Sequence, residues 1–260
     1  MSPTPVRLER EGDLAVVSFD APPLNLFDDA LRTGLVSTLD ALQAQPPRAV
    51  LFRADGRVVS AGVDVSLFAA LASPDEATET FDGLVSIARQ VDSLPCPTVF
   101  AAHALCLTWA FELALACDLI FAAESASFGL VERVIGLTPA MGGTQRLAER
   151  AGTGRAREFV MSGERYPAAT MERWNVVNRV LPDDGFDAAI RAIAAELAIG
   201  PTLAHVATKR VISDYLEGGV ELANDRVGRV AGELFATQDL QDAVATFLRD
   251  GPGKATFRGR

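Results

Sequence analysis

Up to about residue 181, the pattern of apolar residues alternates between that of strands and that of helices. Short apolar runs rich in β-branched residues predict buried strands over residues 14–19, 49–53, 98–102 and 119–122. Apolar residues at helical spacing predict helices between them, over residues 31–42, 81–91 and 111–116. Strand, helix and strand in succession favour parallel pairing with crossover connections. The predicted fold class is therefore α/β.

The pattern changes after about Leu181, beyond which no strand is predicted. Three helical stripes follow, over residues 186–197, 227–235 and 240–247. We therefore expect two regions: an α/β body over residues 1–183, which holds any site, and a helical C-terminal region over residues 184–260.

The stretch 97–123 is apolar enough to raise the question of a membrane span. Pro95 and Pro97 open it, however, and His103, Glu112 and Asp118 interrupt it. We therefore expect this stretch to form buried core.

Charge and cysteine usage limit the partners and the compartment. The formal net charge of −10 over 260 residues disfavours nucleic acid and anionic membranes, which attract basic surfaces. The first 13 residues lack the apolar segment of a secretory signal. Cys96, Cys106 and Cys117 are odd in number and lie in apolar stretches, which is typical of buried free thiols in a reducing compartment. A cytoplasmic location is expected.

Several catalytic motifs are missing from the sequence. It has no G-x-S-x-G nucleophile elbow and no P-loop. Its two histidines, His103 and His205, are far apart, and no Cys/His spacing suits zinc. We therefore expect no metal and no cofactor, which leaves carboxylates, glycine turns and helix N-termini as the means of catalysis.

Three strings of residues contain such groups. The first string, residues 60–64 (SAGVD), is predicted to form a small-residue turn just after a strand. In the second, residues 105–118 (LCLTWAFELALACD), a loop enters a helix, and the free N–H groups at the start of a helix favour an oxyanion. Glu112 lies in the first turns of that helix. Glu132 lies in the third string, residues 127–147, among apolar neighbours that should raise its pKa.

Each string alone also has a plainer interpretation. Glu112 and Glu132 are also consistent with solvated surface carboxylates, His103 with a structural histidine and Trp109 with a core residue. The pair Gly142-Gly143 is typical of a turn or a helix start.

Taken together and in order, the strings resemble the enoyl-CoA hydratase/isomerase family, also called the crotonase family, over nearly the whole chain. The motifs that carry the resemblance are Pro23-x-Asn25, Ala61-Gly62-x-Asp64, Glu112-Leu113-Ala114 leading to Cys117-Asp118, Phe128-Gly129 before Glu132, Gly136, Pro139, residues 142–147 (GGTQRL) and the tail Phe257-Arg258-Gly259-Arg260.

The resemblance implies a spiral of ββα units with a helical C-terminal region that drives trimerisation, often into a dimer of trimers. It implies an acyl-CoA thioester as ligand, bound through Ala61, Val63, Asp64 and Trp109. The thioester oxygen would accept hydrogen bonds from the main-chain N–H groups of Val63 and Trp109. The two glutamates of the family's hydratases fall on Glu112, which would activate water, and Glu132, which would exchange the proton at C2. Arg7, Arg57 and Arg258 are candidates for the CoA phosphates by position.

The sequence departs from the family at three glycines before the catalytic helix, which are here Thr108-Trp109-Ala110. A main-chain N–H survives this substitution, but the indole of Trp109 must either line the acyl pocket or turn into the core. Enoyl-CoA hydration is the leading interpretation. Isomerisation, dehydration or decarboxylation of another acyl-CoA remains open, as does a catalytically weak protein that binds CoA thioesters.

Overall fold

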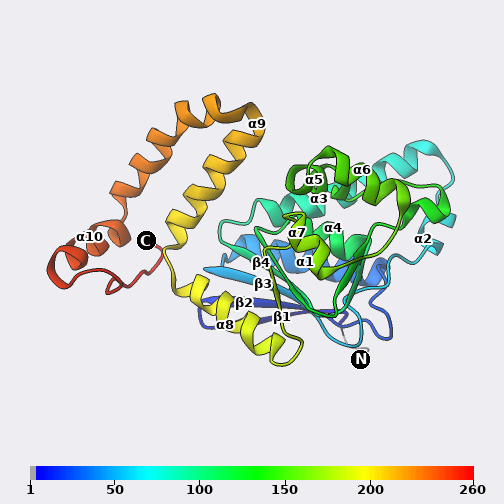
Figure 1. Cartoon of the computed structure of the whole chain (residues 1–260), viewed down its shortest axis with the longest axis horizontal. Coiled ribbons are helices and arrows are strands. Elements are labelled where there is room, and N and C mark those ends of the chain that lie inside the picture. The colour runs from blue at the N-terminus through cyan, green and yellow to red at the C-terminus, as the bar shows by residue number, and fades with distance from the viewer. Residues whose placement is uncertain (1–3) are drawn as a thin grey trace.

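The computed structural model describes residues 4–260, built around a six-stranded sheet (Figure 1). Its strand order is β1-β2-β3-β4-β6-β9, and all neighbours are parallel except the antiparallel pair β1–β2. The strands are β1 (Val6–Glu11), β2 (Leu14–Phe19), β3 (Ala49–Ala54), β4 (Thr98–Ala102), β6 (Leu119–Ala123) and β9 (Arg179–Leu181). The four predicted strands are confirmed as β2, β3, β4 and β6.

A second, smaller sheet contains three short strands in the order β5-β7-β8. These strands are β5 (Leu105–Leu107), β7 (Ser127–Gly129) and β8 (Tyr166–Pro167). Strand β5 leads directly into the helix that carries Glu112, and β7 leads into the turn that carries Glu132. The small sheet therefore brings the two glutamate-bearing segments together.

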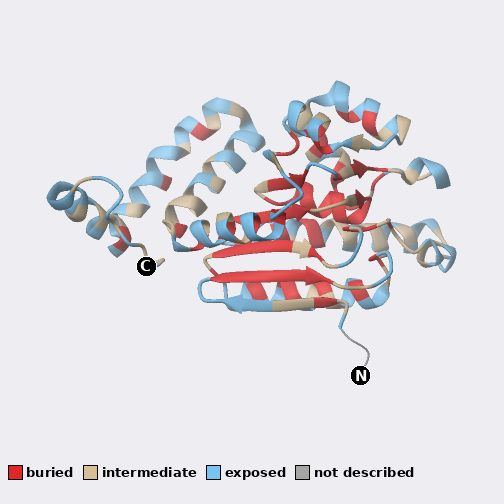
Figure 2. Cartoon of the chain, turned by 60° about the horizontal axis from the view of Figure 1, so that its bottom comes forward, coloured by how far each residue is buried: buried red, intermediate tan, exposed pale blue. Residues whose placement is uncertain are grey.

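The side chains of the large sheet pack alternately into two apolar layers, as successive residues of a strand must. Val17 and Phe19 of β2 pack into the larger core, against the helices that follow β2 and β3. Leu14 and Val16 face the opposite layer, which is covered by α8. Figure 2 shows these central strands as the most buried part of the chain.

The two longest helices of the body, α1 and α3, begin at side-chain caps. Asp28 accepts a hydrogen bond from Leu31 N at the start of α1, and Ser73 accepts one from Glu76 N at the start of α3. The helices of the body are α1 (Asp29–Ala44), α2 (Ser66–Ala69), α3 (Pro74–Asp92), α4 (Trp109–Leu115), α5 (Gly143–Ala151), α6 (Thr153–Ser162) and α7 (Ala168–Arg173), with a 3₁₀ turn η1 (Glu132–Ile135).

The apolar stretch 97–123 forms β4, β5, α4 and β6, and almost all of it is buried within the body. Within residues 4–260, no single helix combines the length and the hydropathy of a membrane span. Only α8 and α9 together would pass that test, and they are bent by 96° from each other.

After β9 the described chain is helical, with α8 (Phe186–Ile199), α9 (Thr202–Glu233), the 3₁₀ turn η2 (Leu234–Ala236) and α10 (Gln238–Asp250). Helix α9 is kinked at Gly218 and Gly219, where Gly219 has a φ of 74°. In Figure 1, α9 and α10 extend away from the sheet. Apolar side chains of this region remain exposed, including 71% of Phe235 and 81% of Leu248.

Candidate active site

A cavity of about 220 Å³ brings together most of the residues predicted to form the site. Ala61, Val63, Trp109, Glu112 and Glu132 all line it. Much of the remaining wall is apolar, from Phe27, Phe68, Phe81, Leu84, Ile135, Leu137 and Met141. The cavity therefore offers an apolar space with a few polar groups, as ligand pockets usually do.

Asp64 is the one predicted site residue that does not line this cavity. Its Oδ1 accepts a hydrogen bond from Ser66 N at 2.9 Å. This bond lowers the pKa of Asp64 and holds the start of α2 beside the cavity.

The N–H groups of Val63 and Trp109 are free to serve a ligand. On either side of Val63, Phe27 N donates to Gly62 O and Asp64 N donates to Phe27 O, but no acceptor within residues 4–260 takes the Val63 N–H. Trp109 begins α4, where the first N–H groups have no partner inside the helix. Its N–H also has no acceptor in the described chain. Two unused donors thus stand on the wall of one cavity.

Glu112 is buried, with 3% of its surface exposed. Its Oε2 accepts hydrogen bonds from Met141 N and Gly143 N, both at 2.8 Å. Burial raises the pKa of Glu112 to about 7, because desolvation of the carboxylate outweighs these two bonds. Glu112 can therefore change its protonation state near neutral pH.

The carboxylate of Glu112 needs a glycine at position 143. A Cβ added to Gly143 would stand 2.6 Å from Glu112 Cγ and 3.0 Å from Oε2. The pair Gly142-Gly143 marks the start of α5, as predicted, and it also makes room for the side chain of Glu112.

Glu132 opens the 3₁₀ turn η1 and is half-buried. Its Oε2 is buried and has no hydrogen-bond partner among the described residues. Burial, and then repulsion from Glu112, raise the pKa of Glu132 to about 8. The raised pKa expected from the apolar neighbours of Glu132 is confirmed.

The indole of Trp109 lies in the core, the second of the two positions considered from sequence. Its Nε1 donates to Ser60 Oγ at 2.7 Å and to Asn25 O at 3.3 Å. The ring lies edge-on to Phe19, with centroids 5.1 Å apart. Only 2% of the residue is exposed, so almost no ring surface remains to narrow the cavity.

Sequence reasoning missed the main-chain donors at Met141 and Gly143, as well as the environment of Thr108. The donors are 29 and 31 positions from Glu112 in the sequence. Every residue except proline has a main-chain N–H, so the residue type does not indicate which N–H groups act as donors. Thr108 lines the cavity with a φ of 48°, and its buried Oγ1 has no partner in the described chain. The replacement of a family glycine at this position was the available signal.

Other candidates from the sequence have structural roles. His103 Nε2 lies 3.0 Å from Gly56 O, and burial lowers the pKa of His103. Arg7 is paired with Asp20 and Asp55 at 2.8 and 2.7 Å. The three cysteines are free and buried, as predicted. Within residues 4–260, no cluster of three or more His, Cys, Asp or Glu side chains could hold a metal ion.

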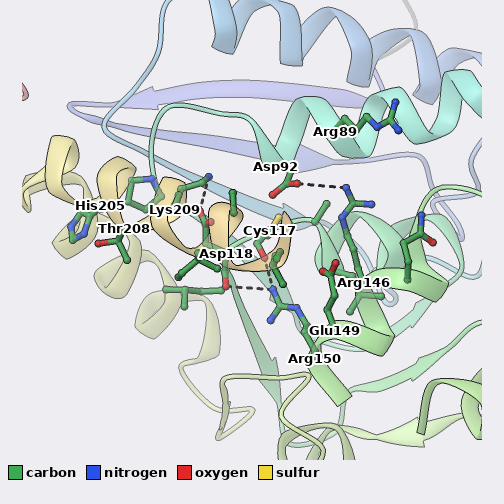
Figure 3. Close-up of a pocket in the computed structure, with 18 of the residues that line it drawn as sticks. Arg89, Asp92, Cys117, Asp118, Arg146, Glu149, Arg150, His205, Thr208 and Lys209 are labelled. Carbon is green, nitrogen blue, oxygen red and sulfur yellow. Dashed lines mark hydrogen bonds and ion pairs between the residues drawn. The ribbon is translucent and has the colours of Figure 1, made fainter. Parts of the chain in front are cut away.

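A larger hollow of about 800 Å³ lies between α9 and the helices α3 and α5 (Figure 3). Most of its cations already have partners within the chain, Arg89 being the exception among the described residues. Lys209 Nζ donates to Leu94 O, Cys96 O and Asp118, and Arg146 is 3.7 Å from Asp92. None of the six predicted site residues lines this hollow.

The same fold and residue pattern occur in known proteins. The family model described as enoyl-CoA hydratase/isomerase matches residues 9–257. A probable enoyl-CoA hydratase of Rhodobacter capsulatus is 30% identical, with 99% of this chain and 100% of that protein covered. The probable enoyl-CoA hydratase echA8 of Mycobacterium tuberculosis is 28% identical, with 97% and 98% covered. An enoyl-CoA hydratase structure from Bacillus anthracis superposes with a TM-score of 0.90 at 24% identity, with 98% and 100% covered. The expected crotonase-like fold is confirmed.

Proposed function

The chain belongs to the enoyl-CoA hydratase/isomerase family, and from this we propose that it is an enoyl-CoA hydratase, which adds water across the C2–C3 double bond of a 2-enoyl-CoA thioester. The observation that carries the proposal is the shared cavity of about 220 Å³. Two carboxyl groups with raised pKa values and two unused main-chain N–H groups meet on its wall. The related proteins named as probable enoyl-CoA hydratases support the same reaction.

In the proposed reaction, the thioester oxygen accepts hydrogen bonds from Val63 N and Trp109 N. As water adds to C3, electrons of the double bond move toward the thioester oxygen and an enolate develops. A preorganised donor at such an oxyanion typically contributes about 3 kcal/mol to transition-state stabilisation. Because both bonds use main-chain atoms, the tryptophan that replaces a family glycine does not remove the donor.

Glu112 acts as the base and Glu132 as the acid. The two N–H bonds to Glu112 Oε2 favour its ionised form, which takes a proton from the water as the oxygen bonds to C3. Glu132, with the higher pKa and an unpartnered Oε2, starts protonated and gives its proton to C2. Water has then been added in full, and the proton on Glu112 passes back to Glu132 to restore the starting state.

The proposed reaction needs no cofactor, because coenzyme A enters as part of the substrate and acid–base groups carry every step. The partners we propose are the thioester and further copies of the chain, in a homotrimer or a hexamer.

The test is to mix the purified chain with crotonyl-CoA and follow the enone absorbance. Hydration removes the conjugated double bond, so the absorbance should fall, and 3-hydroxybutyryl-CoA should appear. Unchanged absorbance with crotonyl-CoA, together with a rise of enone absorbance from a 3-enoyl-CoA, would replace the proposal with isomerisation. Binding of either thioester without turnover would point to a CoA-thioester-binding protein.

A further inference from the structure

Thr108 combines two unfavourable features at one position on the cavity wall. Its backbone has a φ of 48° and a ψ of −120°, in the left-handed half of conformational space that a β-branched residue rarely adopts. Its side chain is buried, with 5% of the residue exposed, and Oγ1 has no hydrogen-bond partner within residues 4–260. Buried hydroxyls are nearly always paired, and such backbone conformations cluster at functional sites. A ligand is therefore the natural partner to consider.

The hydroxyl lies between the two turns that present the proposed oxyanion donors. Thr108 directly precedes Trp109, and Gly62 directly precedes Val63. Oγ1 stands 3.5 Å from the point where a Cβ on Gly62 would lie, so the threonine side chain occupies the space next to that glycine. Thr108, Gly62, Val63 and Trp109 all line the same cavity.

The main chain fixes this arrangement. Thr108 N donates to Gly129 O at 2.9 Å, and Glu112 N donates to Thr108 O at 2.8 Å. The backbone of Thr108 is thus tied at both ends, to β7 and to the first turn of α4, while its hydroxyl remains free to rotate. Oγ1 has almost no accessible surface as it stands, and a turn of the side chain about its Cα–Cβ bond would bring the hydroxyl to the cavity without moving the main chain.

We propose that the Thr108 hydroxyl is a third hydrogen-bond donor to the thioester oxygen, beside the N–H groups of Val63 and Trp109. The proposal rests on the function proposed above, since it takes a CoA thioester as the ligand. It assigns a side-chain donor to a position where the family's glycine supplies none. It also gives the buried Oγ1 the partner that it lacks in the chain.

The decisive variant is Thr108→Val, which removes the hydroxyl and keeps the branched shape. We expect kcat/KM for crotonyl-CoA to fall by about 10-fold or more, less than the roughly 100- to 1000-fold typical of losing an oxyanion donor because the two main-chain donors remain. Thr108→Ser keeps the donor and should stay within about 3-fold of the parent chain. Thr38→Val makes the same change at a buried threonine of α1 that does not line the cavity, and its rate should be unaltered.

Thermal unfolding separates a binding role from a structural one. Because Thr108→Val removes a buried hydroxyl with no partner in the chain, its Tm should be equal to or above that of the parent. A lower Tm together with equal loss of rate in the serine and valine variants would make Thr108 a structural residue and overturn the proposal. Parental kcat/KM in Thr108→Val would overturn it as well.

A ligand that reports carbonyl polarisation makes the test independent of turnover. The conjugated thioester 2,4-hexadienoyl-CoA should shift its absorbance to longer wavelength when donors hold its carbonyl oxygen. We expect a smaller shift and an affinity at least about 5-fold weaker in Thr108→Val, with unchanged affinity for free CoA. A parent chain that shows the shift but does not hydrate crotonyl-CoA would contradict the proposed function and still support Thr108 as a donor. A shift in Thr108→Val equal to that of the parent would contradict the proposed role of Thr108 alone.

Discussion

At the scale of single residues, the two carboxyl groups of the cavity differ in the hydrogen bonds that they accept. Met141 N and Gly143 N donate to Glu112 Oε2, whereas Glu132 Oε2 has no partner in the described chain. Donors favour the ionised form of a carboxyl, and an apolar setting without donors favours the protonated form. Burial raises both pKa values, to about 7 for Glu112, where the two donors oppose it, and to about 8 for Glu132, where repulsion from Glu112 adds to it.

This order predicts the pH dependence of hydration. The active state needs Glu112 ionised and Glu132 protonated, so kcat/KM should rise as pH increases through about 7 and fall above about 8. The two carboxyls repel each other, so the measured values belong to the pair. The measurement is kcat/KM for crotonyl-CoA at pH values on both sides of this range. A rate that keeps rising well above pH 8 would exclude Glu132 as the acid.

Removal of either carboxyl should stop the reaction without unfolding the protein. Glu112→Gln and Glu132→Gln should each lower hydration by about 100-fold or more, since each removes one partner in proton transfer. Near-normal turnover in either variant would exclude that residue from the mechanism.

The thermal stability of Glu132→Gln shows whether its loss of activity comes from unfolding. The pKa of Glu132 is about 8 in the fold against an ordinary value of 4.5, so its ionisation opposes folding. The stability that protonated Glu132 contributes is fully present at pH values below its ordinary pKa of 4.5, and it is lost as pH rises through about 8. Glutamine cannot ionise, so the variant should unfold at the same temperature as the parent chain, or above it, at alkaline pH.

At the scale of elements, the contact between α4 and α5 fixes the position of Glu112, the proposed base. Helix α4 carries Glu112, and the main chain that enters α5 supplies both donors to its carboxylate. Only a glycine at position 143 allows this approach, because the contact of 2.6 Å would be with the Cγ of a buried side chain that has little room to move.

Gly143→Ala should therefore displace Glu112 and reduce hydration by at least about 10-fold, since small displacements of catalytic groups are costly. Gly154→Ala in α6 is the matched control, because a Cβ there meets nothing within 4 Å. We expect the control to retain parental activity and to gain up to about 1 kcal/mol of stability from the better helix former. Crotonyl-CoA kinetics and thermal unfolding of both variants test this pair. Equal activity in the two would show that position 143 does not set the Glu112 carboxylate.

Sequence patterns predicted the elements with long apolar runs and missed the others for physical reasons. Strands β2, β3 and β4 are almost wholly buried, so nearly every residue in them is apolar. Strand β1 is an edge with the sequence VRLERE, and its half-exposed residues leave only a weak pattern. Strands β5, β7 and β8 have two or three residues each, too few for any period to appear.

For the site, family motifs supplied Val63, Trp109, Glu112 and Glu132, and the fold brings all four to one cavity. The position of the Trp109 indole depends on Ser60, Asn25 and Phe19, which are distant in sequence. No local pattern could choose between core and pocket for this ring. The tertiary contacts decide it.

At the scale of the whole molecule, the C-terminal helices leave an extensive apolar surface uncovered. Figure 2 shows α9 and α10 as largely exposed. Large apolar side chains of this region stand at 40% exposure or more at Ile212, Tyr215, Leu216, Val220, Val227, Phe235, Val244, Phe247 and Leu248. Single exposed apolar residues are ordinary, but a row of them along projecting helices is typical of a subunit interface.

We therefore expect the chain to form a trimer or a hexamer through these helices, with part of the CoA site completed across the interface. Phe247→Asp places a charge within the apolar row and should shift sedimentation toward the monomer, because a buried unpaired carboxylate is costly. Arg249→Asp places the same acid at an exposed polar position of α10 and should leave the assembly intact. If the interface completes the CoA site, Phe247→Asp should also raise KM for crotonyl-CoA, while Arg249→Asp should not. A parent chain that sediments as a monomer at micromolar concentration would contradict both the interface and the shared site, because the exposed row would then have no second copy to cover it.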